Sequence, residues 1–127
     1  MDRILWVCFG GAVGSGARYL ISLGALKLLG TGFPYGTLAV NVIGSFLIGL
    51  LNYVGLNSAV ISPTARLFAT TGVMGGLTTY STFNYETLEF LRGADLALAA
   101  ANVGVTVTVC LVAGTLGTVT GRWLIHG

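Results

Sequence analysis

The feature that most constrains this chain is the length of its uncharged runs. No Asp, Glu, Lys or Arg stands between Lys27 and Arg66, a stretch of 38 residues. Residues 67–85 and 96–121 form further uncharged runs of 19 and 26 residues, and 4–17 is also uncharged. A helix that spans a bilayer needs about 20 mainly apolar residues. The runs therefore predict an all-α integral membrane protein, with one transmembrane domain over 1–127 and four spans at about 4–29, 36–57, 63–92 and 95–123.

The composition excludes several other classes of protein. Charged residues make up 8% of the chain, against about 25% in an ordinary soluble domain, and the mean hydropathy is +0.88. A net charge of +2 is too small for a surface that follows the phosphates of a nucleic acid. The sequence also has no Ser/His/Asp set, metal-ligand cluster or phosphate-binding loop. We therefore expect no enzyme and no nucleic-acid partner, but a chain that contacts membrane lipid.

Turn and capping residues separate the expected spans. The stretch Gly30–Pro34 is rich in glycine and ends in proline, which favours a turn between the first two helices. Ser62 can cap the third helix with Pro63 at its first position. Asp95 can cap the fourth.

The Lys/Arg content of the loops gives no preferred orientation. Four spans place three basic residues on each side of the membrane: Arg3, Arg66 and Arg122 on one, and Arg18, Lys27 and Arg92 on the other. Orientation follows the Lys/Arg bias, so a chain without bias can insert both ways round. This predicts an antiparallel, dual-topology homodimer. If Arg18 is buried and does not count, the bias is still only one charge.

Two spans carry polar or small residues at steps of three and four, which keeps them on one helix face. The second span has Asn41, Ser45, Gly49 and Asn52, and the fourth has Asn102, Thr106, Cys110, Gly114, Gly117 and Gly121. In the first span, Gly10 and Gly14 have the spacing of close helix contacts, with Arg18 on the same face. Such stripes indicate either tight helix packing or the lining of a conduction path.

The third span contains the most informative segment, residues 72–86. Two adjacent glycines are followed by hydroxyl residues at 78, 79, 81 and 82, a poor sequence for a helix. Non-helical backbone at membrane depth occurs only where protein buries it or water lines it. The segment predicts a third helix that is broken in mid-span; the alternative is a glycine kink in a continuous helix.

Side chains after the expected break have a pattern that suits an anion. Tyr80 and Phe83 are three residues apart and share a helix face, and aromatic rings have a positive edge. Glu86 follows one turn later, either as a carboxylate near the membrane interface or as a partner for Arg18. Ionisable groups inside a membrane are functional candidates.

Over essentially its whole length, the chain resembles the CrcB/Fluc family of fluoride channels. The resemblance rests on three blocks: Gly10–Gly14 with Arg18 and Tyr19; Pro34–Asn41 with Gly44 and Gly49; and Gly75–Phe83 with Glu86. It implies antiparallel homodimers with two fluoride pathways, in the bacterial inner membrane. The implied activity is passive export of fluoride, which protects the cell from this ion.

The resemblance also implies roles for particular residues. A structural Na⁺ on the dimer two-fold axis would be held by the backbone carbonyls of Gly75 and Thr78. Pathway residues would be Asn41, Tyr80, Ser81, Thr82 and Phe83, together with Asn102, Thr106 and Cys110 on the fourth span. Further functional residues would be Arg18, Thr79 and Glu86. Two residues depart from the family pattern, because Tyr80 stands where a phenylalanine is usual and Cys110 where a serine is common.

The main alternative is a small proton-coupled exporter of organic cations, which would have similar length and four spans. Such an exporter needs an acidic residue within the membrane, typically in the first span. Here the first span has only Asp2 at its end, and Glu86 and Glu89 stand near a helix end. A subunit with only an assembly role would leave the broken third span unexplained.

Overall fold

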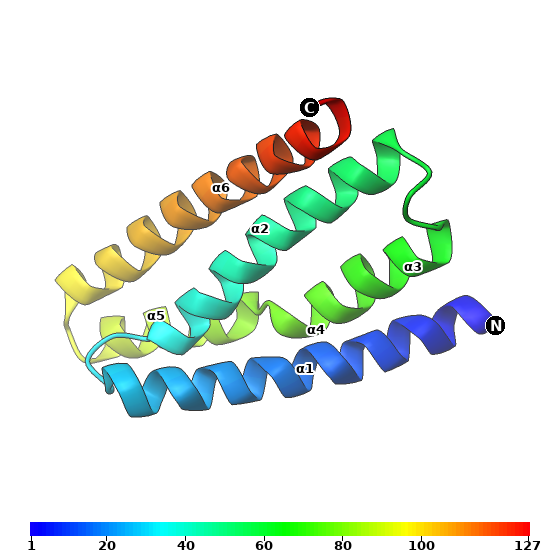
Figure 1. The fold of residues 1–127 in the computed structure, drawn as a ribbon. Coiled ribbons are helices and arrows are strands. Elements are labelled where there is room, and N and C mark those ends of the chain that lie inside the picture. Colours follow the sequence, from blue (N-terminus) through cyan, green and yellow to red (C-terminus); the bar gives the residue numbers. More distant parts are fainter.

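The computed structural model describes all 127 residues, and its regular elements are all helical. Three helices are long and apolar enough to cross a membrane: α1 (Asp2–Leu29), α2 (Tyr35–Asn57) and α6 (Leu96–His126). Between α2 and α6 the chain forms four successive shorter segments (Figure 1), namely α3 (Pro63–Leu67), the π-helical η1 (Phe68–Met74), α4 (Gly75–Leu77) and α5 (Tyr80–Arg92).

The helices form a bundle whose two termini lie toward the same end (Figure 1). The α1 helix packs mainly against η1 and also contacts α2 and α4, whereas α2 packs along most of α6. The α5 helix packs mainly against α6. The run from α3 to α5 thus lies between the α1 side and the α6 side of the bundle.

The bounds of the three long helices lie within three residues of those expected from the uncharged runs. Both expected caps are confirmed, because Ser62 Oγ accepts a hydrogen bond from the Ala65 amide at 3.1 Å and Asp95 Oδ1 accepts one from the Leu98 amide at 3.1 Å. The third span was expected to be one helix over 63–92 with a single break, but its geometry also changes before that break. The first half of this run changes from α- to π-helical geometry at Phe68.

Glycines allow the α1 and η1 backbones to touch. A methyl group added at Gly10 would lie 2.7 Å from the Phe68 carbonyl oxygen, and one added at Gly14 would overlap the Val73 carbonyl oxygen. On the other side of the bundle, a methyl group at Gly117 of α6 would overlap the Phe46 carbonyl oxygen of α2. At these positions the packing interpretation of the glycines is confirmed.

The third run is broken at Thr78 and Thr79, both of which have extended backbone with ψ angles of 155° and 115°. This excludes a continuous helix with a glycine kink. The break lies after the glycine pair, since Gly75 has helical angles (φ −61°, ψ −38°) and Gly76 lies within α4. Gly76 has a packing role instead, because a methyl group there would lie 2.5 Å from the Gly11 carbonyl oxygen.

Candidate functional site

A side chain of α2 holds the broken backbone in place. Asn41 donates from Nδ2 to the Thr79 carbonyl oxygen at 3.1 Å, and its Oδ1 accepts from the Thr79 amide at 2.8 Å. Both backbone polar groups of Thr79 are therefore satisfied by one amide side chain. An unpaired backbone group in a bilayer costs several kcal/mol, so this amide replaces the bonds that a continuous helix would have supplied.

The break leaves the carbonyl groups of residues 75–78 without backbone donors, among them the two that were predicted to bind a cation. In a continuous helix the Thr79 amide would bond to Gly75, but here it bonds to Asn41. The Thr82 amide would bond to Thr78, but here it bonds to Thr79 Oγ1 at 3.2 Å. The Gly75 and Thr78 carbonyl oxygens accept no backbone hydrogen bond. They are therefore available to another donor or to a cation.

Three hydroxyl groups gather at the start of α5. Thr79 Oγ1 caps the helix, donates to Thr82 Oγ1 at 3.1 Å and lies 3.4 Å from Ser81 Oγ. Thr79 is buried within the subunit, whereas Ser81 is exposed. The cluster offers neutral hydroxyl groups at the surface of the subunit beside the break.

The two aromatic rings expected to share a face are neighbours. The ring centroids of Tyr80 and Phe83 are 5.9 Å apart with the planes inclined at 59°. Phe83 is 9% exposed and Tyr80 is 77% exposed. One ring is thus packed inside the subunit while the other projects from it.

The rings border a cavity of about 370 Å³, here called the aromatic cavity, which opens at the break. It brings together five of the sequence-predicted pathway residues, and Thr79 also lines it. Those five are Asn41, Tyr80, Phe83, Thr106 and Cys110. None of its lining residues is charged. The cavity therefore combines amide, hydroxyl and thiol groups with two aromatic rings.

A second cavity, of about 320 Å³, lies on the α1 side of Thr79 and is here called the arginine cavity. Its lining is almost wholly polar: Ser15, Arg18, Tyr19, Ser22, Thr37, Thr79 and Thr82. The Nε atom of Arg18 is buried and has no hydrogen-bond partner. Because Thr79 lines both this cavity and the aromatic cavity, the two approach each other at the break.

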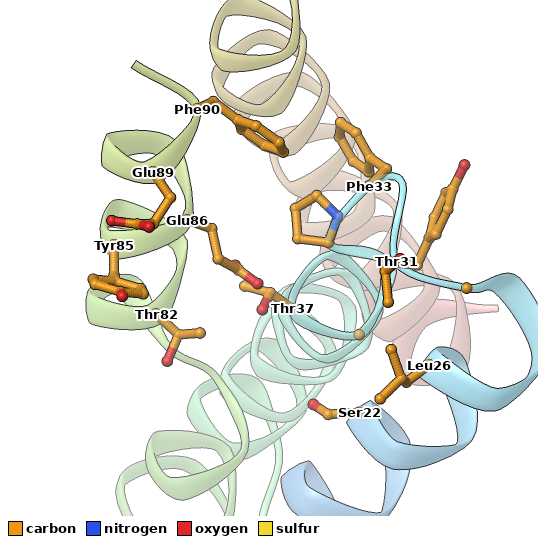
Figure 2. A pocket seen from close by; sticks show the side chains of 14 residues that line it. Ser22, Leu26, Thr31, Phe33, Thr37, Thr82, Tyr85, Glu86, Glu89 and Phe90 are labelled. Carbon is orange, nitrogen blue, oxygen red and sulfur yellow. The ribbon is translucent and has the colours of Figure 1, made fainter. Parts of the chain in front are cut away.

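A third cavity, the mouth cavity, has a volume of about 460 Å³ and lies toward the α1–α2 loop (Figure 2). It shares Thr37 and Thr82 with the arginine cavity. In Figure 2 the Glu86 side chain extends from α5 toward Thr37 of α2. The Oε1 atom of Glu86 is buried without a hydrogen-bond partner. Together the three cavities follow α5 from Glu86 to the broken backbone.

The expected alternative of an ion pair between Arg18 and Glu86 is wrong. The chain has one ion pair, between Arg92 Nη1 and Glu89 Oε1 at 2.7 Å. Arg18 lines the arginine cavity and Glu86 the mouth cavity, so the two charges belong to different spaces. Arg18 Nε and Glu86 Oε1 each have no hydrogen-bond partner within the subunit.

Two sequence-predicted pathway residues lie outside these cavities. Ser81 is exposed, and Asn102 is 1% exposed and bonded to Thr87 and Thr106. Sequence reasoning missed Thr37, which lines two cavities. The available signal was its position four residues before Asn41, which continues the polar stripe of α2 by one turn.

Comparison with known proteins gives a consistent result. Residues 5–118 match the family model described as CrcB-like protein, Camphor Resistance (CrcB). A curated protein from Sorangium cellulosum is 50% identical over all of both chains, and one from Anaeromyxobacter sp. is 54% identical over 98% of each. A protein from Geobacter sulfurreducens is 46% identical over 98% of this chain and all of its own. Each of these relatives is named fluoride-specific ion channel FluC.

Proposed function

The chain belongs to the CrcB-like family, and from this premise we propose that it is a fluoride-specific ion channel. It would act as a multi-pass protein of the bacterial inner membrane that lets fluoride leave the cell passively and so lowers its toxicity. The observation that carries the proposal is the aromatic cavity, which joins neutral hydrogen-bond donors and aromatic rings with no charged group. The curated relatives are named as channels, which transport ions and do not transform a substrate.

The chemistry of fluoride explains why such a lining suits it. Fluoride is small and strongly hydrated, so a pathway has to replace its water with donors. A conducting site has to bind the ion well enough to admit it and weakly enough to release it. Amide and hydroxyl donors and the positive edges of aromatic rings provide moderate attraction, whereas a full positive charge would hold the anion.

We propose that the ion moves along α5 through the three cavities. Arg18, in the wall of the arginine cavity, would attract the anion toward the break without forming a conducting site itself. Thr79 would stand where the arginine and aromatic cavities approach each other. Glu86 would stand at the mouth, with Thr37 beside it. The remaining groups that line this path would be Asn41, Tyr80, Thr82, Phe83, Thr106 and Cys110. Ser81 would lie beside the path next to Thr79, and Asn102 next to Thr106.

The unit of function in this proposal is an antiparallel homodimer. Tyr80 projects from the subunit, and Thr71, Gly75 and Ser81 are also exposed although they lie in the middle of the third run. Polar surface at this depth favours protein over lipid as the covering partner. The equal numbers of basic residues on the two sides support insertion in both directions.

In the dimer, we propose that the Gly75 and Thr78 carbonyl oxygens of both subunits hold a Na⁺ on the two-fold axis. The donor set fits, because these two carbonyl groups lack backbone donors and a methyl group at Gly75 would meet nothing within 4 Å. Oxygen ligands suit a hard cation. The bound ion would supply positive charge that offsets the carbonyl dipoles where two breaks meet.

The test is passive efflux from liposomes that contain the purified protein, followed with a fluoride electrode. We expect fast fluoride efflux without chloride leak, and no proton-coupled uptake of organic cations. Phe83→Ile should abolish the efflux, since it removes the ring edge. Phe9→Ile is the matched control, because Phe9 is an exposed ring on α1 outside the three cavities. Folded wild-type protein without fluoride efflux would refute the proposed function.

A further inference from the structure

The α5 helix is attached to the rest of the bundle by side-chain hydrogen bonds at two points. Asn41 of α2 binds the backbone of Thr79, the residue that caps α5. Asn102 of α6 donates from Nδ2 to Thr87 Oγ1 at 2.9 Å. Phe83 lies midway, four residues from Thr79 and four from Thr87.

We propose that Asn102 and Thr87 form a latch that positions the Phe83 ring, so that Asn102 is a positioning residue and not a ligand of the ion. This inference rests on the proposed channel function.

The latch is continuous from α6 to the backbone that carries the ring. Thr106 Oγ1 donates to Asn102 Oδ1 at 3.5 Å, Asn102 Nδ2 donates to Thr87 Oγ1, and Thr87 Oγ1 donates to the Phe83 carbonyl oxygen at 2.9 Å. The bond between Asn102 and Thr87 is the one side-chain hydrogen bond that joins α5 to α6. A displacement of α5 along α6 would therefore break this chain of bonds.

The burial of Asn102 supports a positioning role over direct contact with an ion. Its side chain is 1% exposed and does not line the aromatic, arginine or mouth cavity. A buried amide has to be hydrogen-bonded to offset its desolvation, and Thr87 and Thr106 supply those partners. Apolar packing alone would hold α5 in a less specific position, because apolar contacts, unlike hydrogen bonds, do not depend on direction.

The test compares four variants in the liposome assay: Thr87→Val, Thr87→Ser, Asn102→Leu and the Thr87→Val/Asn102→Leu pair. Valine keeps the shape of threonine but removes the hydroxyl group, whereas serine keeps the hydroxyl group. Thr115→Val is the matched control, because Thr115 Oγ1 donates to the carbonyl oxygen four residues earlier, Leu111, on the exposed side of α6. Fluoride efflux and the ratio of fluoride to chloride permeability are measured for each folded variant.

We expect Thr87→Val to reduce efflux by at least about threefold, the effect of losing one average interhelical hydrogen bond in a bilayer, and to lower the permeability ratio. Thr87→Ser and Thr115→Val should behave as wild type. The efflux of the double variant should be no lower than that of the more affected single variant, since the two substitutions remove the same hydrogen bond. A role limited to folding would reduce the amount of folded protein without changing the permeability ratio.

Two results would overturn the latch. If Asn102→Leu loses efflux while Thr87→Val does not, Asn102 contacts the ion directly. If both variants keep the wild-type ratio, α5 is positioned by packing alone. Should Thr87→Val not fold, Thr87→Cys replaces it, because a thiol is both a weak acceptor for Asn102 and a weak donor to the Phe83 carbonyl group. Wild-type behaviour of that variant would also contradict the latch. A wild-type protein that conducts no fluoride would instead refute the channel function.

Discussion

At the scale of single residues, Asn41 has the largest expected effect. Asn41→Leu would leave the Thr79 amide and carbonyl groups unpaired, and each unsatisfied group costs about 1–3 kcal/mol. We expect a clear fall in the midpoint of thermal unfolding in detergent and loss of fluoride efflux. Asn52→Leu is the matched control, since Asn52 lies three turns further along α2 and is not bonded to Thr79. Equal unfolding midpoints for the two variants would contradict the role of Asn41.

A second residue-scale prediction concerns the contact between α1 and η1. Gly14→Ala would place a methyl group against the Val73 carbonyl oxygen, and overpacking of this kind costs about 1–3 kcal/mol. A methyl group at Gly16 would meet nothing within 4 Å. Only Gly14→Ala should therefore lower the unfolding midpoint. The prediction fails if both alanine variants unfold at the same temperature.

Local spacing was sufficient to predict some residue-scale features and not others. The Tyr80–Phe83 pair and the close contact at Gly10 and Gly14 follow from helix geometry, and both were predicted. The partner of Asn41 could not be found in this way, because Thr79 is 38 positions away in the sequence. For the same reason the sequence left open whether Glu86 pairs with Arg18, which depends on how α5 and α1 are placed.

At the scale of elements, the cap of α6 gives a direct test. Asp95→Ala removes the acceptor for the Leu98 amide and should destabilise the protein by about 1 kcal/mol. Asp95→Asn keeps an oxygen acceptor and should recover most of the loss. Unfolding in detergent measures both, and an asparagine variant as unstable as the alanine variant would show that the charge matters more than the cap.

The element bounds were predictable where local chemistry sets them. Ser62 and Asp95 were identified as caps because a cap needs only a few neighbouring residues. The π-helical η1 was missed, since no residue pattern specifies its wider turns and the contact with the α1 backbone is tertiary. The break was predicted from the glycines and hydroxyl groups, but it lies at Thr78 and Thr79 because Asn41 satisfies the backbone there.

At the scale of the whole molecule, the balance of basic residues predicts how the chain inserts. Lys27→Gln and Arg3→Gln remove one exposed charge from opposite sides and should bias insertion in opposite directions. Each variant alone should give fewer antiparallel pairs and less fluoride efflux from cells. Expressing both variants together should restore the efflux. If neither variant changes the location of a reporter fused to the C-terminus, the balance of charge does not determine orientation.

The glycine contacts between α1, η1 and α4 have a mechanical consequence. Where two backbones touch with no side chain between them, there is no free volume into which either can rotate. We therefore expect α1, η1 and α4 to move together as one rigid unit. The α5 helix, which carries both aromatic rings, has no such backbone contact and is held instead by the side-chain hydrogen bonds of Asn41 and Asn102.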